Sequence, residues 1–386
     1  MTSEERREAR YQRRKAKREE KKLRDVGDAL DFDKVFTYKN MYKSALLCYK
    51  GVSWKASVQS FKARGGILTM RRLKELRNGV FNMKRGPEFV VYERGHRRLI
   101  NSIHIKDRVP AKCLCKFSLK PVLHRSLVYD NCASREGKGI KKARKRLDCH
   151  LERHIRKHGL KGGMIIFDFK GFFDSIQHKL VHYVLNRQYE DKRIIGMNMK
   201  IVRLFRKDVG LILGSENSQD FAISAPNFFD HFIKEVLGLP DSARYMDDGY
   251  IIHESFDRLK EAFPKIKEVA AALGFKLNEK KTRLIRFGKQ FSYLKRKYDF
   301  TQTGQIIKRP DRNSVIRMRR KLKKFQKKFY EGKMKLNDIL QSLNSWKASL
   351  IGTRCKKVIK SIDKLFDRLF IQPFLSGEEE HVLQAA

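Results

Sequence analysis

The sequence predicts an α+β fold in which an antiparallel sheet is backed by helices. Three observations carry this prediction. Residues 243–252 have the pattern of a β-hairpin, residues 164–168 form an apolar run typical of a strand, and apolar residues in the last third of the chain recur at helical spacing. The length of 386 residues is enough for two or three domains or subdomains, each with a substantial core.

The chain is strongly basic, with 88 Lys and Arg against 43 Asp and Glu and a net charge of +45. Such an excess favours a polyanionic partner, with nucleic acid first and an anionic membrane second. No run of about 18 apolar residues occurs, and the N-terminus is too charged for a signal peptide. The six cysteines form no C-x-x-C pairs, so we expect reduced thiols in a cytoplasmic protein without a membrane segment.

Adjacent carboxylates dominate the predicted hairpin, where Asp247 and Asp248 lie between two apolar runs and Gly249 follows them. We expect the Asp–Gly step to form the turn. Two neighbouring carboxylates repel each other at neutral pH, and divalent cations would remove that cost. The alternative is a charged turn without further function, and the hairpin alone does not decide between the two.

A second carboxylate segment decides between these two alternatives in favour of a cation site. Asp168 stands near the end of the apolar strand, and Gly171 breaks the strand pattern just after it. Three carboxylates on two neighbouring strands could hold two Mg²⁺ ions, which would activate a 3′-hydroxyl and stabilise a leaving pyrophosphate.

Both segments resemble the catalytic palm motifs of reverse transcriptases, and Tyr-Met-Asp-Asp at 245–248 is close to a signature of that family. The resemblance runs from about residue 86 to residue 370. It implies a right-hand polymerase that adds dNTPs to a primer 3′-hydroxyl on an RNA template, with template RNA and RNA/DNA duplex as partners. It also implies two Mg²⁺ ions, with Mn²⁺ as an alternative. Their site is formed by Asp168, Phe169, Asp247 and Asp248, of which the three aspartates are catalytic.

The resemblance divides the chain into consecutive parts. These are a charged N-terminal arm (1–30), N-terminal helices and fingers (31–160), the palm (161–300), a helical thumb (301–372) and a C-terminal tail (373–386). Residues 1–25 of the arm could form a solvated helix laced with i,i+4 ion pairs or a disordered basic segment that touches RNA. Residues 36–49 predict a first packed helix.

The fingers are expected to begin with two strands, 89–92 and 97–101, joined by a turn at 93–96. By resemblance, Arg97 and Arg98 lie where the family carries basic residues that meet the incoming triphosphate, and we include Arg98 among the dNTP-binding residues. Arg135 is expected to meet the same triphosphate from the glycine-containing loop 133–140, whose flexible basic character suits phosphate binding. For any single arginine in so basic a chain, a solvated surface charge is the alternative.

The third palm motif, residues 210–222, has Leu213 where most relatives have a glutamine that lies against the templating base pair. Leu213 followed by Gly-Ser, and then by Ser-Gln at 218–219, resembles the reverse transcriptases of diversity-generating retroelements, which copy template adenines with errors. We include Leu213 and Gln219 among the dNTP-binding residues. An aliphatic side chain makes no hydrogen bonds, so looser control of the template base is physically sensible. A packing substitution with ordinary fidelity remains open.

Other site residues follow from the same register. Phe173, five residues after Asp168, is the expected steric gate that excludes a 2′-hydroxyl. Lys281, in the fourth palm motif, could protonate the leaving pyrophosphate, or it could be an ordinary solvated lysine. Tyr293 and Leu294 lie in the segment that resembles the primer grip.

Two helical patterns complete the chain. Residues 256–273 predict a helix capped by Ser255 and stopped by Gly274. In the expected thumb, apolar stripes begin at Val315, Leu336 and Val358, and eight of the twelve residues from Arg317 to Lys328 are basic. A helix of this kind packs by one face and offers the other to a duplex backbone.

His150, His154 and His158 share one helix face and could bind a metal, but no obvious further ligand completes the set.

The biological system has several candidates. The leading interpretation is a diversity-generating retroelement with a structured template RNA and a basic accessory protein. A phage-defence reverse transcriptase is the alternative within the enzyme class, and a non-catalytic RNA-binding protein with a polymerase fold is the alternative outside it. No His-Asn-His endonuclease follows the expected thumb and the retron Val-Thr-Gly triplet is absent, which argues against a complete group II intron protein and a retron.

Overall fold

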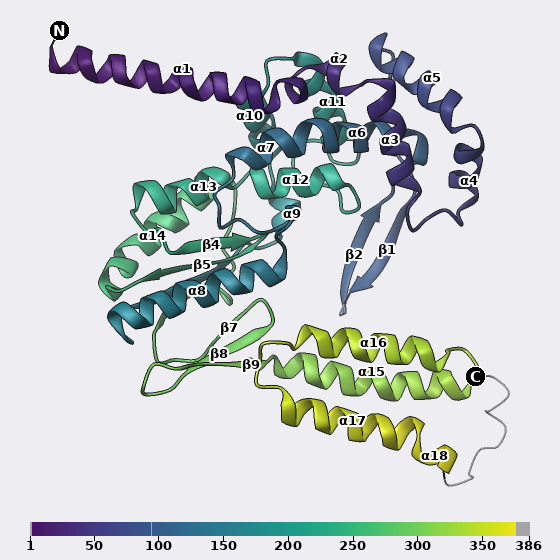
Figure 1. Ribbon diagram of the computed structural model, residues 1–386, viewed down its shortest axis with the longest axis vertical. Coiled ribbons are helices and arrows are strands. Elements are labelled where there is room, and N and C mark those ends of the chain that lie inside the picture. Colours follow the sequence, from purple (N-terminus) through teal and green to yellow (C-terminus); the bar gives the residue numbers. More distant parts are fainter. Residues whose placement is uncertain (1, 94, 376–386) are drawn as a thin grey trace. The chain divides into compact units, whose positions relative to one another are not determined.

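The computed structural model describes residues 2–93 and 95–375 and combines helices with β-sheets (Figure 1). The chain divides into two compact units. The first contains residues 1–146, 167–249 and 262–282, and the second contains residues 147–166, 250–261 and 283–386. Each unit therefore combines segments that are distant in the sequence.

The first 126 residues are mainly helical. The helices are α1 (Ser3–Leu30), α2 (Phe32–Val35), α3 (Tyr38–Tyr49), α4 (Ala56–Ala63), α5 (Gly65–Arg77), α6 (Ile105–Leu114), the π-helical segment η1 (Cys115–Leu119) and α7 (Lys120–Ser126). The packed helix predicted in 36–49 is confirmed as α3. Thr37 caps it by accepting a hydrogen bond from the Asn40 backbone N–H at 3.2 Å, and Met41 and Ala45 are fully buried. The charged arm is also helical, as α1.

The predicted pair of strands in the fingers is confirmed as β1 (Glu88–Glu93) and β2 (His96–Asn101). They pair antiparallel, with Glu88 opposite Asn101 and Glu93 opposite His96. Residue 94, in the predicted turn, lies outside the described residues. Every side chain of β1 is exposed, and a lone two-stranded hairpin is only marginally stable in water. The backbone N–H of Asn101 attaches the hairpin to its unit by donating to the Leu213 carbonyl at 2.9 Å.

The central part of the chain contains a four-stranded sheet in the order β4-β5-β3-β6. Its strands are β3 (Gly163–Asp168), β4 (Ser242–Tyr245), β5 (Asp248–His253) and β6 (Arg283–Arg286). The helices are α8 (Ile140–His158), α9 (Phe172–Ser175), α10 (His178–Gln188), α11 (Lys192–Arg203), α12 (Glu216–Ser224), α13 (Asn227–His231), the π-helical segment η2 (Phe232–Val236) and α14 (Phe256–Ala272). β3 is almost wholly buried, as its apolar sequence predicts, and pairs antiparallel with β6. Ser255 caps α14 as predicted, accepting a hydrogen bond from the Arg258 backbone N–H at 3.2 Å.

A second sheet follows, formed by β7 (Phe291–Tyr293), β8 (Arg296–Phe300) and β9 (Ile306–Pro310). β7 and β8 form a hairpin whose two turn residues, Leu294 and Lys295, have φ values of 44° and 64°. Positive φ at both positions is the conformation whose twist matches that of the flanking strands. The segment that resembles the primer grip is therefore a hairpin, and both Tyr293 and Leu294 are buried in it.

The chain ends in a bundle of three long helices, α15 (Arg312–Tyr330), α16 (Leu336–Ser349) and α17 (Lys356–Phe370), followed by the short α18 (Gln372–Leu375) (Figure 1). The predicted apolar stripes form its core, which contains Met318, Leu322, Phe329, Ile339, Leu343, Ile362, Phe366 and Phe370. Residues 306–310, inside the range expected for the thumb, belong to β9. Of the expected C-terminal tail, residues 376–386 lie outside the described residues.

Within the described part of the chain, no helix is long and apolar enough to cross a membrane. All six cysteines are free thiols, and four of them are buried.

Candidate active site

The turn between the two strands that flank the paired aspartates lies two residues earlier than the sequence predicted. β4 ends at Tyr245 and β5 begins at Asp248, so Met246 and Asp247 form the turn and Gly249 lies inside β5. Met246 has a φ of 56°. This left-handed conformation costs a residue with a side chain roughly 1–2 kcal/mol. The expected Asp–Gly turn is therefore wrong, and the turn that forms needs support from its surroundings.

Arg244 provides that support. Its side chain is only 1% exposed, and Nη1 donates to the Met246 carbonyl at 2.9 Å. Nη2 also donates to the Ile223 carbonyl at 2.9 Å, and Asp230 in α13 accepts two further bonds from the guanidinium. We assigned no role to Arg244 from the sequence, although a cation inside a buried strand signals a paired and specific position.

Gly249 is required by packing. A Cβ built on this residue would lie 2.1 Å from Cζ of Phe167. The Phe167 ring is itself held edge-on against Phe229, with centroids 5.4 Å apart. Glycine therefore allows the start of β5 to lie directly against the ring from β3, which brings the two aspartate-bearing strands close together.

Hydrogen bonds join the end of β3, at Asp168 and Phe169, to Asp247 and to residues 278–282. The Phe169 N–H donates to the Asp247 carbonyl at 3.1 Å, and the Asn278 N–H donates to the Asp168 carbonyl at 2.7 Å. The Asp168 N–H donates to Thr282 Oγ1 at 3.4 Å. Segments that begin near residues 168, 247 and 278 therefore meet at the end of β3.

Burial and repulsion by neighbouring carboxylates both disfavour the ionised forms of Asp247 and Asp248. Burial, followed by the charge of Asp168, raises the pKa of Asp247 above its usual value. Burial, followed by the charges of Asp247 and Asp168, raises the pKa of Asp248 to about 7. A divalent cation would relieve this repulsion, and carboxylate oxygens are the ligands that Mg²⁺ prefers. The carboxylate oxygens of these aspartates are thus suitable ligands for the expected Mg²⁺.

Lys281 lies beside these carboxylates, with Nζ 2.8 Å from Asp168 Oδ2. Burial lowers the pKa of Lys281, but its hydrogen bond to Asp168 and the charges of the three aspartates together outweigh burial and leave the pKa above its usual value. Among the residues described, no three His, Cys, Asp or Glu side chains are arranged to hold a metal ion. The Lys281 ammonium group contacts Asp168 Oδ2, an oxygen that would be needed to bind a metal ion.

A cavity of about 870 Å³ opens beside Asp168 and Asp247, whereas Asp248 is not among its lining residues. Seven residues predicted for the site line it: Arg98, Asp168, Phe169, Phe173, Leu213, Asp247 and Lys281. Phe169 could offer a metal only its backbone carbonyl, because its side chain has no ligand atom. Arg97, which the resemblance groups with Arg98, also lies on the wall, together with Lys170 and Arg206, which were not predicted as site residues. Carboxylates and several cations in one cavity suit a ligand that combines phosphates with a divalent cation.

The part of the wall that contains Phe173 and Leu213 is held together by backbone pairing. The Leu211 N–H donates to the Phe173 carbonyl at 2.8 Å, and Gln177 and Val209 form an antiparallel bridge. These bonds bring the expected gate residue and the segment containing Leu213 to the same wall. The side chains of Phe173 and Leu213 are both half-buried.

Two predicted dNTP-binding residues do not line the cavity. Arg135 is half-buried, and its guanidinium donates to the backbone carbonyls of His124, Val128 and Asn131 at 3.1–3.2 Å. It therefore holds the loop that we expected to bind phosphate. Gln219 is exposed on α12 and accepts a hydrogen bond from Ser134 Oγ at 3.2 Å. Their contacts with a nucleotide stay predictions, as do those of Tyr293 and Leu294 with a primer.

The histidines of α8 have other partners. His150 is buried and hydrogen-bonded to the Tyr250 hydroxyl at 3.0 Å, and His154 is bonded to the Lys161 carbonyl at 2.9 Å. Two of the three histidines thus make hydrogen bonds within the fold.

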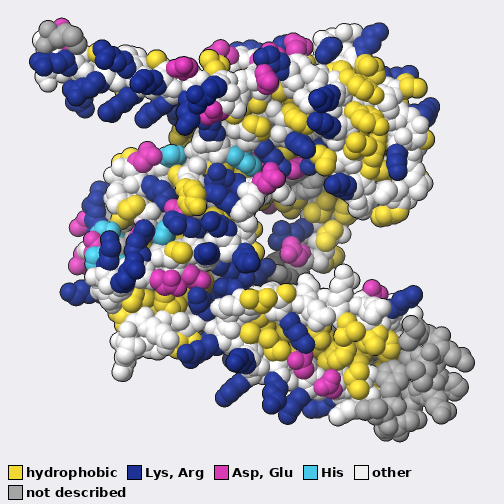
Figure 2. All heavy atoms as spheres, viewed as in Figure 1, with side chains coloured by type: hydrophobic (Ala, Val, Ile, Leu, Met, Phe, Trp, Pro, Cys, Tyr) yellow, Lys and Arg dark blue, Asp and Glu magenta, His cyan; other side chains and the backbone are white. Residues whose placement is uncertain are grey.

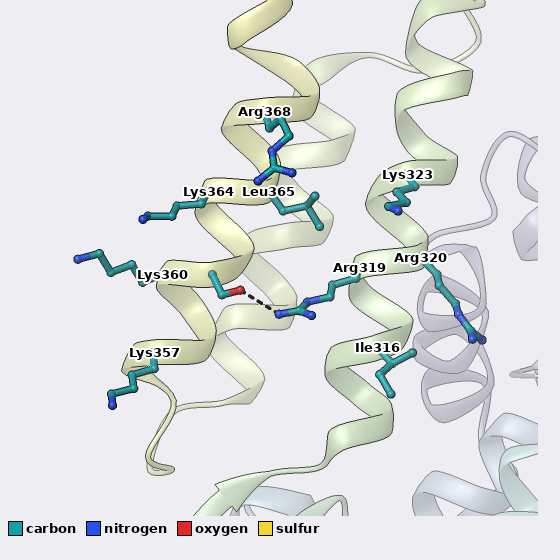
Figure 3. Close-up of a pocket in the computed structure, with 10 residues that line it drawn as sticks. Ile316, Arg319, Arg320, Lys323, Lys357, Lys360, Lys364, Leu365 and Arg368 are labelled. Atoms are coloured by element: carbon teal, nitrogen blue, oxygen red, sulfur yellow. Dashed lines mark hydrogen bonds between the residues drawn. The ribbon is translucent and has the colours of Figure 1, made fainter.

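The helical bundle presents a basic groove between α15 and α17 with a volume of about 720 Å³ (Figure 3). Seven of the ten lining residues are Lys or Arg: Arg319, Arg320, Lys323, Lys357, Lys360, Lys364 and Arg368. The figure shows Arg319 reaching from α15 to Ser361 of α17, a hydrogen bond of 2.9 Å. We expected the basic face of α15 from the sequence but missed the contribution of α17, whose lysines become relevant only once the helices pack together.

Comparisons with known proteins identify the family. Residues 84–301, more than half of the chain, match the family model described as reverse transcriptase (RNA-dependent DNA polymerase). A search of curated protein sequences gives no significant match.

Solved structures of telomerase are similar at low identity. Telomerase from Candida albicans in complex with a TWJ fragment of telomeric RNA aligns with a TM-score of 0.47 and 12% identity, over 81% of this chain and 63% of that chain. Apo telomerase from Candida tropicalis, truncated from its C-terminal domain, aligns with a TM-score of 0.44 and 16% identity, over 58% of this chain and 54% of that chain. This chain thus spans less than two thirds of the length of either. The family match confirms the predicted α+β polymerase fold, and the chain belongs to the reverse transcriptase family of RNA-dependent DNA polymerases.

Proposed function

We propose that this protein synthesises DNA on an RNA template by adding dNTPs to a primer 3′-hydroxyl, with two Mg²⁺ ions or, alternatively, Mn²⁺. The observation that carries the proposal is the shared cavity, in which Asp168 and Asp247 lie together with Phe173, Leu213 and Lys281. Reverse transcriptases as a family use divalent metal ions. We place the enzyme in the cytoplasm because its cysteines are free thiols.

The proposed reaction assigns the site residues three roles: metal binding, triphosphate binding and proton donation. Asp168, Asp247 and Asp248 would hold the metal ions, which when bound activate the attacking hydroxyl and neutralise charge on the phosphates. Arg98 on the same wall would bind the triphosphate. Lys281, whose raised pKa keeps it protonated, would donate a proton to the leaving pyrophosphate.

The groove between α15 and α17 would bind the backbone of the template–primer duplex. Its seven cations make no base-specific array, so we expect binding that is insensitive to sequence and weakens as salt is raised.

The decisive test is primer extension on a defined RNA template, comparing wild type with Asp247→Ala and with Asp257→Ala. Asp257 is an exposed aspartate of α14 and serves as the matched control. We expect Asp247→Ala to abolish synthesis with Mg²⁺ while RNA binding and folding persist, and Asp257→Ala to behave as wild type. Residual cDNA from Asp247→Ala would show that the carboxylates are wrongly assigned. RNA binding by wild type without synthesis would favour the non-catalytic alternative.

We further propose that the enzyme serves a diversity-generating retroelement, with a structured template RNA and a basic accessory protein. Leu213 supports this, because its aliphatic side chain lines the cavity where a hydrogen-bonding residue is usual in the family. Sequencing the cDNA should show errors concentrated at template adenines, and Leu213→Gln should reduce them. Faithful copying by wild type would favour the phage-defence alternative, and a near-repeat pair beside the gene would favour the retroelement.

A further inference from the structure

Helix α1 extends away from the rest of its unit over most of its length (Figure 1). From Ser3 to Lys21, every residue except Ala9 is exposed. Its anchoring contacts lie at the other end. There Ser118 Oγ donates to the Ala29 carbonyl at 2.8 Å, and Arg125 Nη2 lies 3.7 Å from Asp25 Oδ2. About five turns of helix are thus presented to the surroundings without packing support.

Most cations of this helix gather on one face. Lys and Arg recur there every three or four residues, at Arg6, Arg10, Arg13, Lys17, Lys21 and Arg24, with Arg7, Arg14 and Arg18 beside them. Glu20 is the one acidic residue within this face, and the opposite face is of mixed charge, with Glu4, Glu8, Glu19, Lys15 and Lys22. Figure 2 shows the Lys and Arg side chains in a row along the helix. We call the nine cations the α1 basic face.

The α1 basic face opposes helix formation by itself. Five pairs of its cations stand at i,i+4, beginning with Arg6–Arg10 and ending with Lys17–Lys21, and each such pair destabilises an isolated helix. Ion pairs that could compensate lie near the base of the helix, Lys22–Glu19 at 3.8 Å and Arg24–Asp25 at 3.5 Å. A polyanion along this face would convert the repulsion into attraction.

We propose that the α1 basic face binds the sugar-phosphate backbone of a double-helical RNA segment, at a site separate from the active-site cavity. From Arg6 to Arg24 the face extends about 27 Å, with cations about one helical turn apart, so it can follow a row of phosphates. An anionic membrane fits less well, because Tyr11 is the only large apolar side chain between Ser3 and Lys22. The family's use of RNA makes an RNA stem the fitting occupant.

The test compares two double variants of the full-length protein that lose the same charge. Lys17→Gln with Lys21→Gln removes two cations from the α1 basic face. Lys15→Gln with Lys22→Gln removes two from the opposite side of the same helix. Affinity for an RNA hairpin is measured by fluorescence anisotropy over a range of salt concentrations, and circular dichroism shows that α1 persists in both variants. Vesicles containing phosphatidylserine are the second probe.

We expect the Lys17/Lys21 variant to bind the hairpin about tenfold more weakly, and its logarithmic salt slope to fall by about two. The Lys15/Lys22 variant should match wild type. Equal losses in both variants would overturn the proposal, since net charge alone would then explain binding. A loss confined to vesicle binding would overturn it in favour of a membrane. Because binding requires no synthesis, the result is independent of the proposed polymerase activity, which can be removed in parallel by Asp247→Ala.

Discussion

Arg244 and Asp230 form a buried ion pair beside the turn that carries Asp247, with Nε–Oδ1 and Nη2–Oδ2 distances of 2.8 and 2.7 Å. Because Arg244 also donates to the Met246 carbonyl, the same guanidinium stabilises the fold and places Asp247. The pair thus connects the stability of the chain to the geometry of its site.

Removing one partner of this pair should be strongly destabilising. We expect Arg244→Met to lower the free energy of unfolding by about 3–5 kcal/mol, because Asp230 would be left buried without a counter-charge. Lys333→Met, which removes an exposed ion pair with Glu331, should leave it unchanged. Chemical denaturation of both variants measures the difference, and equal midpoints would show that the buried pair contributes nothing.

Gly249→Ala tests the close approach of β5 to β3. The new methyl group would meet the Phe167 ring, so β5 must shift and carry Asp248 with it. A shift of about 1 Å can reduce the rate by about 10²-fold. Gly196→Ala in α11 is the matched control, because nothing lies within 4 Å of its added Cβ. Primer extension at saturating dNTP measures both, and undiminished synthesis by Gly249→Ala would contradict the packing argument.

Lys281→Met tests whether Lys281 is a proton donor or an ordinary solvated lysine. If Lys281 protonates pyrophosphate, the maximal rate should fall by about 10²-fold or more. Since its ammonium contacts Asp168, its loss should also lower the Mg²⁺ concentration that gives half of the maximal rate. Titration of primer extension with Mg²⁺ reports both quantities. If the variant matches Lys289→Met, a control at an exposed position, then Lys281 is only a surface charge.

Phe173→Ala tests the sugar gate. Removing the ring from the cavity wall should raise incorporation of ribonucleotides relative to deoxynucleotides by about 10–200-fold. The ratio of kcat/KM for a matched rNTP and dNTP measures this. Phe228→Ala removes an equal ring that packs against Tyr183 and should leave the ratio unchanged. An unaltered ratio in Phe173→Ala would place the gate elsewhere.

The local parts of this protein could be predicted from its residues. The fingers strands, α3, the capped α14 and the bundle stripes all follow from hydrophobic periodicity and capping, which act over a few residues. The turn at Met246 was missed because its left-handed conformation depends on Arg244, whose partner Asp230 belongs to another element. Local turn preferences carry no information about such a contact.

Residue types and spacing by themselves determined the chemistry available to this protein: the carboxylates, the aromatic ring five residues after Asp168, and the excess of cations. Only the tertiary structure decided which of these meet. It places Phe173, Leu213 and Asp168 around one cavity and commits Arg135 to backbone carbonyls. It also joins the cations of α15 and α17 in one groove. The physical reason is that a side chain's partners are set by long-range backbone pairing and core packing, which bring together residues far apart in the chain.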